Sequence, residues 1–297
     1  MSDYDFWLID AFTDRPLAGN PCAVLTDAEG LSDAQMQTIA TEMNQSETAF
    51  VLPSSKADVA ARYFTPAEEI PLAGHPTLAV TRALLETGRI PITGDGTAFT
   101  LELPAAVVRV EIEADSERMT MTQPAPRFGR SYEASEVLPV FGLQPDDVLT
   151  GYSPETVSTG TPQLMVPVRN CQTLLSAVFQ PDSYRELKAR GDFFSPHLFC
   201  LEGFTPSGTT AARHFGVSPD RSEDPFTGSA TGGMAAYLWR HGLLSTPTFV
   251  AQQGHNMGRP GQAEVRVIGE RNEISAVRVS GQAVALVHGR MTVPEGE

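Results

Sequence analysis

The sequence contains no long apolar segment. No run approaches the roughly 18 apolar residues that a helix needs to cross a bilayer. Residues 1–5 are acidic and lack the basic and then apolar layout of a signal peptide. These absences argue against membrane-spanning and secreted proteins, and we expect a cytoplasmic protein.

Cysteine is scarce. The 297 residues include three cysteines, Cys22, Cys171 and Cys200, which are far apart in the sequence. An odd number at such spacing offers no disulfide framework and is typical of a reducing compartment. Neither Cys-x-x-Cys nor His-Glu-x-x-His is present, so we expect no metal site. The glycine-rich stretches match neither a phosphate-binding loop nor the dinucleotide fingerprint, so the sequence gives no sign of ATP or NAD.

Basic residues are outnumbered. The chain has 21 Lys and Arg against 36 Asp and Glu, a formal net charge of -15 and a pI near 4.8. Such a surface repels phosphate backbones and anionic lipids, so we expect neither nucleic acid nor a membrane as a partner. A small anionic molecule could bind only where the fold creates a local positive potential.

The residues that are present suit a two-domain globular protein. The hydrophobic fraction is 41%, and the length is about enough for two cores. Many short strand-like segments and few helical ones favour α+β domains, with sheets curled around a small number of buried helices. A proline-rich stretch at residues 124–126 marks the boundary, which gives domains 1–122 and 123–281. We expect residues 282–297 to complete the first domain.

Two segments of the chain share one layout. Each has Arg-x-Phe on a strand, an acidic linker, a Pro-apolar-small-Gly turn, and a helix that ends at a glycine. The matching positions are Arg62, Phe64, Pro66, Pro71, Gly74 and Gly88 in the first half and Arg213, Phe215, Pro219, Pro225, Gly228 and Gly242 in the second. Chance could produce such a layout, because strand-turn-helix units are common. Recurrence of five features in one order favours two homologous domains that face each other across a cleft.

The start of each repeated helix offers amide groups to a ligand. Gly74 and His75 begin one helix, and Gly228 and Ser229 begin the other. Each helix start carries about half a positive charge, and glycine lets a ligand approach the backbone closely. Pro76 has no amide hydrogen to donate, so the amides of Gly74 and His75 must bind the ligand. We therefore predict a binding site for a substrate carboxylate inside an acidic protein.

Three side chains near these helices could move a proton. A capped helix predicted from Ser32 to about residue 44 leads directly to Glu47, at the mouth of an apolar strand. Taken singly, Glu47 could be a solvated surface residue, His75 a structural histidine and Asp224 a turn or cap. Gathered at one anion site, the three favour proton-transfer chemistry.

A set of motifs spread over nearly the whole chain carries a family resemblance. They are Asp10-Ala11-Phe12, Gly19-Asn20-Pro21, Met43-Asn44-Gln45-Ser46-Glu47-Thr48-Ala49-Phe50, Arg62-Tyr63-Phe64-Thr65-Pro66, Ala73-Gly74-His75-Pro76-Thr77, Ser222-Glu223-Asp224-Pro225-Phe226-Thr227-Gly228-Ser229-Ala230, Gln253-Gly254 and Met257-Gly258-Arg259-Pro260. In this order and combination they resemble the PhzF-like phenazine-biosynthesis isomerase family.

The resemblance implies a fold and a function. The expected fold is diaminopimelate-epimerase-like: α+β, with two pseudo-symmetric domains, each a mostly antiparallel sheet rolled around a central helix, and the active site in the interdomain cleft. The expected function is that of a cofactor-independent isomerase, usually a homodimer, whose best-defined family member isomerises trans-2,3-dihydro-3-hydroxyanthranilate. By the matched motifs, Glu47 would be the general acid/base, with His75 and Asp224 as catalytic partners.

The same motifs imply the substrate contacts. The substrate carboxylate would bind the amides of Gly74, Gly228 and Ser229, and Asn20 and Ser46 are expected to lie near the substrate. We expect Glu47 to remove a proton from one carbon and return it to another on the same face. One base is enough for such a shift, whereas epimerisation needs a group on each face.

Two other functions stay open at this point. Related epimerases and proline racemases carry a cysteine at each helix start, where this chain has Ala73 and Thr227. Neither residue can replace a thiolate base, so a two-thiol racemase is disfavoured. The remaining alternatives are an amino-acid epimerase or racemase of another type, and a non-catalytic small-molecule-binding or regulatory protein.

Overall fold

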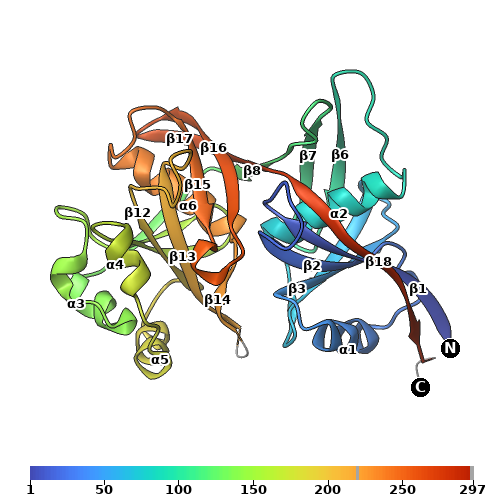
Figure 1. Cartoon of the computed structure of the whole chain (residues 1–297), viewed down its shortest axis with the longest axis horizontal. Helices are drawn as coiled ribbons and strands as arrows, with labels where there is room; N and C mark the ends of the chain where they lie inside the picture. The colour runs from blue at the N-terminus through green and yellow to red at the C-terminus, as the bar shows by residue number, and fades with distance from the viewer. Residues whose placement is uncertain (219–220, 295–297) are drawn as a thin grey trace. The chain divides into compact units, whose positions relative to one another are not determined.

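A computed structural model describes residues 1–218 and 221–294 of the chain. The chain divides into two compact units (Figure 1): unit 1 is Met1–Thr122 with Ser280–Glu297, and unit 2 is Gln123–Val279. Pro219, one position of the sequence repeat, lies outside the described residues.

Unit 1 contains two α-helices and a sheet that joins both ends of the chain. Its elements are β1 (Ser2–Ala11), β2 (Asn20–Leu25), α1 (Asp33–Met43), β3 (Glu47–Leu52), β4 (Val59–Phe64), β5 (Glu69–Ile70), α2 (Gly74–Glu86), β6 (Gly96–Glu102), β7 (Val107–Glu113), β8 (Met119–Pro124), which runs past the unit boundary, and β18 (Ala283–Val293). The strands pair in the order β18-β1-β2-β3-β4-β6-β7-β8. The pairs β2–β3 and β4–β6 are parallel, the others are antiparallel, and the short β5 pairs with β4.

Unit 2 repeats this pattern. Its elements are β9 (Arg127–Ser131), α3 (Ala134–Val137), η1 (Leu138–Phe141), η2 (Pro145–Asp147), β10 (Glu155–Ser158), β11 (Pro162–Pro167), α4 (Cys171–Ser176), α5 (Pro181–Ala189), β12 (Ser195–Cys200), β13 (Thr210–Ser218), β14 (Arg221–Asp224), α6 (Gly228–Arg240), β15 (Thr248–Gln253), η3 (His255–Met257), β16 (Gly261–Glu270) and β17 (Glu273–Gly281), which ends in unit 1. The strands pair in the order β9-β10-β11-β12-β13-β15-β16, with β11–β12 and β13–β15 parallel and β14 paired with β13. The succession from β10 to β16 thus matches β1 to β7, with α6 in the place of α2.

A buried helix lies at the centre of each unit. Helices α2 and α6 have 13 residues each, and nine residues of α2 and ten of α6 are buried. A helix that is buried on nearly all sides is enclosed by the rest of its domain rather than laid on its surface. Each helix ends near a glycine of positive φ, Gly88 (68°) and Gly242 (73°), as the sequence predicts. The predicted α+β class is confirmed.

The structure also contains elements that the sequence did not predict. The last strand continues to Val293, because it pairs along β1 as far as Ser2. A six-residue helix, α4, begins after Asn170, whose side-chain oxygen accepts a hydrogen bond of 2.8 Å from the Thr173 amide. Helices α3, α4 and α5 gather on one side of unit 2 (Figure 1), and each contributes to its hydrophobic core, through residues such as Leu187.

Each unit carries an ion pair at the equivalent position of its sheet. In unit 1, Nε and Nη2 of Arg62 both lie 2.7 Å from the carboxylate oxygens of Glu69. In unit 2, the same atoms of Arg213 lie 2.9 and 2.8 Å from the carboxylate of Glu223. The strand registers agree, since Phe64 faces Glu69 and Phe215 faces Glu223. The repeated Arg-x-Phe motif and acidic linker therefore form the same ion pair in both units.

The two arginines differ in burial. The Arg213 side chain is 11% exposed and also donates to the carbonyls of Leu174 (3.1 Å) and Ala177 (2.7 Å), whereas Arg62 is 25% exposed. Loss of a buried arginine leaves a buried carboxylate and two carbonyls without their partner. We predict that Arg213→Ala lowers the free energy of unfolding by about 3 kcal/mol, and Arg62→Ala by about 1 kcal/mol. Urea denaturation of both variants tests this, and equal losses would contradict it.

A chain of four buried polar side chains crosses the sheet of unit 2. The Ser195 hydroxyl donates to Oε1 of Gln163 (2.7 Å), so its oxygen accepts from Nε2 of His214 (2.8 Å). His214 Nδ1 then accepts from Nδ1 of His197 (3.2 Å). Burial lowers the pKa of His197 to about 3, and burial together with the neighbouring His197 holds the pKa of His214 well below its usual value. Both rings are neutral in the folded protein.

These histidines make the protein sensitive to acid. Below about pH 6.5 the unfolded chain takes up protons on both residues while the folded chain does not, so stability falls as the pH falls toward 3. We predict that His197→Asn, which keeps a donor to His214, reduces this dependence by about 1.4 kcal/mol per pH unit between about pH 5.5 and 4. Urea denaturation over this range gives the slope. An unchanged slope would show that His197 is already protonated in the folded protein.

Candidate active site

Glu47 is placed by the end of the preceding helix. The Ser32 hydroxyl and the Gln35 side chain form the predicted capping box at the start of α1. Asn44 ends that helix with a φ of 49°, in the left-handed region that asparagine tolerates. The chain then turns into β3, whose first residue is Glu47 and whose side chain is 17% exposed. Ser46, the residue before it, is buried.

Glu47, His75 and Asn20 lie in contact with one another in unit 1. The Asn20 amide nitrogen lies 3.1 Å from His75 Nδ1, and His75 Nε2 lies 3.1 Å from Glu47 Oε2. An amide NH₂ can only donate, so His75 Nδ1 accepts and the ring carries its proton on Nε2. The nitrogen that carries the proton is therefore the one near the Glu47 carboxylate. The sequence predicted Glu47 and His75 as catalytic residues and Asn20 as a neighbour of the substrate, and the structure brings these three together.

The register of the parallel strands β2 and β3 explains why Asn20 and Glu47 lie close together. Asn20 begins β2, and Cys22 lies opposite Glu47 in β3. Side chains two apart on a strand share a face, so Asn20, Cys22 and Glu47 lie on the face of the sheet that α2 covers. Cys22 is a neighbour of the site that the sequence did not reveal. Burial and the charge of Glu47 raise the pKa of the Cys22 thiol, so this thiol is protonated beside the carboxylate.

The loop before Asn20 has little freedom. Asp10 is fully buried, and its Oδ2 accepts a hydrogen bond of 2.7 Å from the Leu17 amide. Gly19 has a φ of 57°, and a Cβ there would lie 2.1 Å from the Ala11 carbonyl oxygen. Only glycine fits this position. Asp10 and Gly19 thus fix the loop that delivers Asn20 to His75.

The first turn of α2 provides the backbone part of the site. Gly74 and His75 are its first two residues, and no side chain caps this end, because the N-cap position is Ala73. A helix cannot satisfy its first amides internally, so they are directed out of the helix start. The Thr77 hydroxyl donates to the Ala73 carbonyl (2.9 Å) and so ties the turn down.

Asp224 lies beside the start of the equivalent helix in unit 2. It is 4% exposed, and its Oδ2 accepts a hydrogen bond from the Thr227 hydroxyl. Gln253 holds the same turn, because its Oε1 accepts from the Thr227 amide (3.2 Å) and its Nε2 donates to the Asp224 carbonyl (2.8 Å). A Cβ at Gly254 would lie 2.5 Å from the Pro225 carbonyl oxygen, which accounts for the Gln-Gly pair of the motif.

Two further side chains hold the start of α6. Gln123 Nε2 donates to the Gly228 carbonyl (2.9 Å), and the Thr159 hydroxyl donates to Gln123 Oε1 (2.5 Å). A Cβ at Gly232 would lie 1.8 Å from that amide oxygen, so only glycine admits Gln123 here. Sequence reasoning missed Gln123 and Thr159, since nothing in a local pattern shows that they reach Gly228. The amides of Gly228 and Ser229 begin a helix that, like α2, has no side-chain cap.

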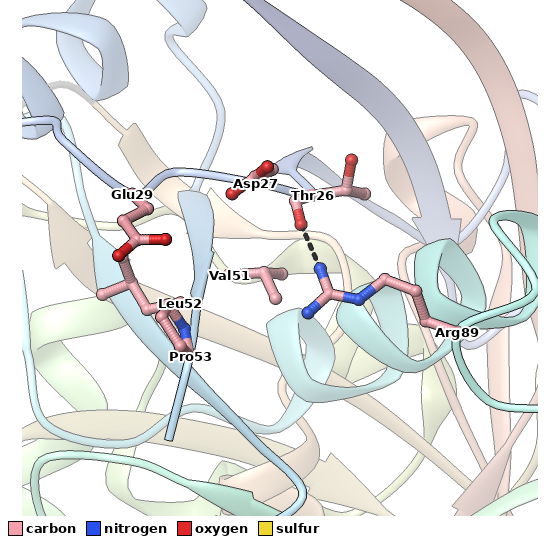
Figure 2. A pocket seen from close by; sticks show the side chains of 7 residues that line it. All are labelled: Thr26, Asp27, Glu29, Val51, Leu52, Pro53 and Arg89. Carbon is pink, nitrogen blue, oxygen red and sulfur yellow. Dashed lines mark hydrogen bonds between the residues drawn. The ribbon is translucent and has the colours of Figure 1, made fainter. Parts of the chain in front are cut away.

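A separate pocket of about 330 Å³ lies elsewhere in unit 1 (Figure 2). It is lined by Thr26, Asp27, Glu29, Val51, Leu52, Pro53 and Arg89. The Arg89 guanidinium points toward Thr26 and donates to its carbonyl. Glu47 and Leu52 are at opposite ends of β3, about 16 Å apart for an extended strand, so this pocket takes no part in the candidate site.

Known proteins resemble this chain over almost its full length. A family model described as "Phenazine biosynthesis-like protein" (PhzC-PhzF) matches residues 9–289. An uncharacterised isomerase of Clostridium acetobutylicum is 33% identical over 305 residues, covering 98% of each chain. The trans-2,3-dihydro-3-hydroxyanthranilate isomerase of Pseudomonas aeruginosa is 33% identical over 294 residues, covering 95% of this chain and 97% of the relative. The solved structure of a Bacillus anthracis PhzF-family protein has a TM-score of 0.88 at 29% identity, covering 99% of this chain and 100% of that one.

The chain belongs to the phenazine biosynthesis-like family. The resemblance predicted from the motifs is confirmed, and with it the assignment as an isomerase. Within the described parts of the chain, no helix is long and apolar enough to span a bilayer. In residues 1–218 and 221–294, no group of three or more His, Cys, Asp or Glu side chains is arranged to hold a metal ion.

The Asn20–His75 contact predicts one tautomer of the histidine. In the wild-type protein we expect the His75 proton on Nε2, because Nδ1 accepts from the Asn20 amide. Asn20→Asp replaces that donor with an acceptor, so His75 Nδ1 should gain a proton that it donates to the new carboxylate.

Ring ¹⁵N chemical shifts of histidine-labelled protein report this change, with His75→Gln as the control that assigns the signal. A wild-type His75 protonated on Nδ1 would contradict the arrangement.

Proposed function

We propose that the protein is a cofactor-independent isomerase that moves a proton between two carbons of a small, cyclic, carboxylated substrate, with Glu47 as the general acid/base. The observation that carries the proposal is the Asn20–His75–Glu47 arrangement, in which His75 Nε2 lies 3.1 Å from one oxygen of a carboxylate whose side chain is 17% exposed. Such a carboxylate is held in place yet open on one side, as a proton carrier must be.

The chemistry needs no second base. Glu47 takes a proton from a carbon made acidic by a neighbouring unsaturated system and returns it to another carbon on the same face of the substrate. His75 Nε2–H lies 3.1 Å from Glu47 Oε2 and so favours the charged form of Glu47, which is the form that takes the proton in the first step. At the helix starts, Ala73 and Thr227 offer no group that could act as a base on the opposite face. This favours a proton shift over epimerisation.

The backbone amides at the starts of α2 and α6 support a carboxylated substrate. We propose that the amides of Gly74, Gly228 and Ser229 bind the substrate carboxylate, because uncapped starts of long helices stabilise an anion. Asp224 is proposed as the second catalytic partner, and Asn20 and Ser46 as neighbours of the substrate. The isomerase name of the Pseudomonas aeruginosa relative supports a substrate similar to trans-2,3-dihydro-3-hydroxyanthranilate.

Glu47→Gln tests the role of the base. We predict that it lowers turnover of trans-2,3-dihydro-3-hydroxyanthranilate on the order of 100- to 10,000-fold, because glutamine keeps the shape but cannot take a proton. Glu42→Gln is the matched control, since Glu42 lies on the exposed surface of α1, and it should retain wild-type turnover. The reaction is followed by NMR in deuterated water, where the new C–H position gains solvent deuterium to the extent that the proton held by Glu47 exchanges before it is returned.

The outcomes separate the parts of the proposal. Full turnover by Glu47→Gln would remove Glu47 from the mechanism. Deuterium uptake with inversion at one carbon would identify an epimerase. Turnover of other cyclic carboxylates, but not of this compound, would refute the substrate and leave the base intact. Binding without turnover of any of them would indicate a non-catalytic protein.

A further inference from the structure

Two of the three cysteines, which are far apart in the sequence, meet in unit 2. Cys200 ends strand β12, and Cys171 begins helix α4. The two side chains lie near enough for each to affect the pKa of the other, and both residues contact Glu202. Both are free, and Cys22 lies in the other unit. Neither residue belongs to the candidate active site.

The fold, rather than flexible loops, places this pair. The parallel strands β11 and β12 run side by side, and the Val168 amide, just past the end of β11, donates to the Phe199 carbonyl (2.8 Å). Cys200 follows Phe199, and three residues after Val168 the chain enters α4 at Cys171. The two cysteines therefore sit on neighbouring backbone segments that hydrogen bonds hold together.

Glu202 fixes the pair more closely. Its carboxylate accepts a hydrogen bond of 3.1 Å from the Cys171 amide, and its carbonyl lies 3.5 Å from Cys200 Sγ, which donates to it. One residue thus holds the backbone of one cysteine and the thiol of the other. Cys200 is buried in the hydrophobic core of unit 2, whereas Cys171 is partly exposed at its edge. A small oxidant can reach Cys171 first, with Cys200 directly behind it.

We propose that Cys171 and Cys200 are a redox modification site, at which hydrogen peroxide converts the two thiols into a reversible disulfide. Cys171 attacks peroxide as the thiolate and becomes a sulfenic acid, with one oxygen transferred and hydroxide released. The Cys200 sulfur then attacks the Cys171 sulfur, the S–O bond breaks, and water leaves. In sum, two thiols and one peroxide give one disulfide and two waters. A small thiol reductant reverses the change.

The surroundings of the thiols set the rate. Burial and the Glu202 charge raise the pKa of Cys171, and burial raises the pKa of Cys200 to about 12. Because the thiolate is the nucleophile, oxidation is slower than that of a free cysteine and quickens about tenfold per pH unit near neutrality. Specificity comes from the neighbouring thiol, which captures the sulfenic acid before a second peroxide does.

Mass spectrometry of the peroxide-treated full-length protein tests the proposal. We expect a loss of about 2 Da, one crosslinked peptide pair containing Cys171 and Cys200, an unmodified Cys22, and full reversal by dithiothreitol. The closed loop of about 30 residues should raise the melting temperature of the oxidised protein on the order of 5–10 °C.

The matched control is Cys200→Ala, which leaves Cys171 without a resolving thiol. In this variant we expect no crosslink and a gain of about 32 Da at Cys171, the mass of a sulfinic acid. A sulfinic acid at Cys171 of the wild-type protein, or a crosslink to Cys22, would overturn the proposal. The proposal would also be overturned if neither cysteine of the folded protein reacted with peroxide at pH 8.5. The control for this outcome is the same protein in denaturant, in which both cysteines should react.

Discussion

The hydrogen bond from the Asn20 amide to His75 Nδ1 determines what the rest of the site can do. It fixes the ring proton on Nε2, the nitrogen that lies 3.1 Å from Glu47 Oε2, so this nitrogen cannot take a proton from Glu47. Much of unit 1 serves this contact. The buried Asp10 and the obligatory Gly19 hold the loop before Asn20, and the uncapped start of α2 presents His75.

The two units use the same scaffold for different purposes, as their strand registers show. Arg62 faces Phe50, and Arg213 faces Leu198, so Glu47 and Ser195 occupy equivalent positions three residues earlier. The parallel neighbours agree, since Cys22 faces Glu47 as Gln163 faces Ser195.

At these equivalent positions the units differ in chemistry. In unit 2, Ser195, Gln163 and the two histidines are joined by hydrogen bonds in a buried network. In unit 1, the same place holds a carboxylate that is partly open to solvent. The repeated fold therefore supplies an inert polar core in one unit and a proton carrier in the other.

Some of this could be predicted from the sequence because the signals are local. The capping box at Ser32, the glycines that end α2 and α6, and the Gly74 turn each depend on neighbouring residues only. The fold class and the family follow from such signals in their order. What the sequence could not show depends on register between distant segments. The Asn20–His75 contact joins residues 55 apart, and Gln123 reaches Gly228 across 105 residues.

The cysteines show most clearly that contacts between distant segments cannot be predicted from the sequence. Cys22, Cys171 and Cys200 give no pattern in the sequence, and their odd number argues against a disulfide framework. Yet the parallel register of β11 and β12 brings Cys171 and Cys200 to one residue, Glu202, and the parallel register of β2 and β3 places Cys22 opposite Glu47. Position on the sheet, not spacing along the chain, thus gives each cysteine its chemistry. A thiol beside a carboxylate stays protonated and inert, while a thiol at the edge of the core with a second thiol behind it can cycle between two redox states.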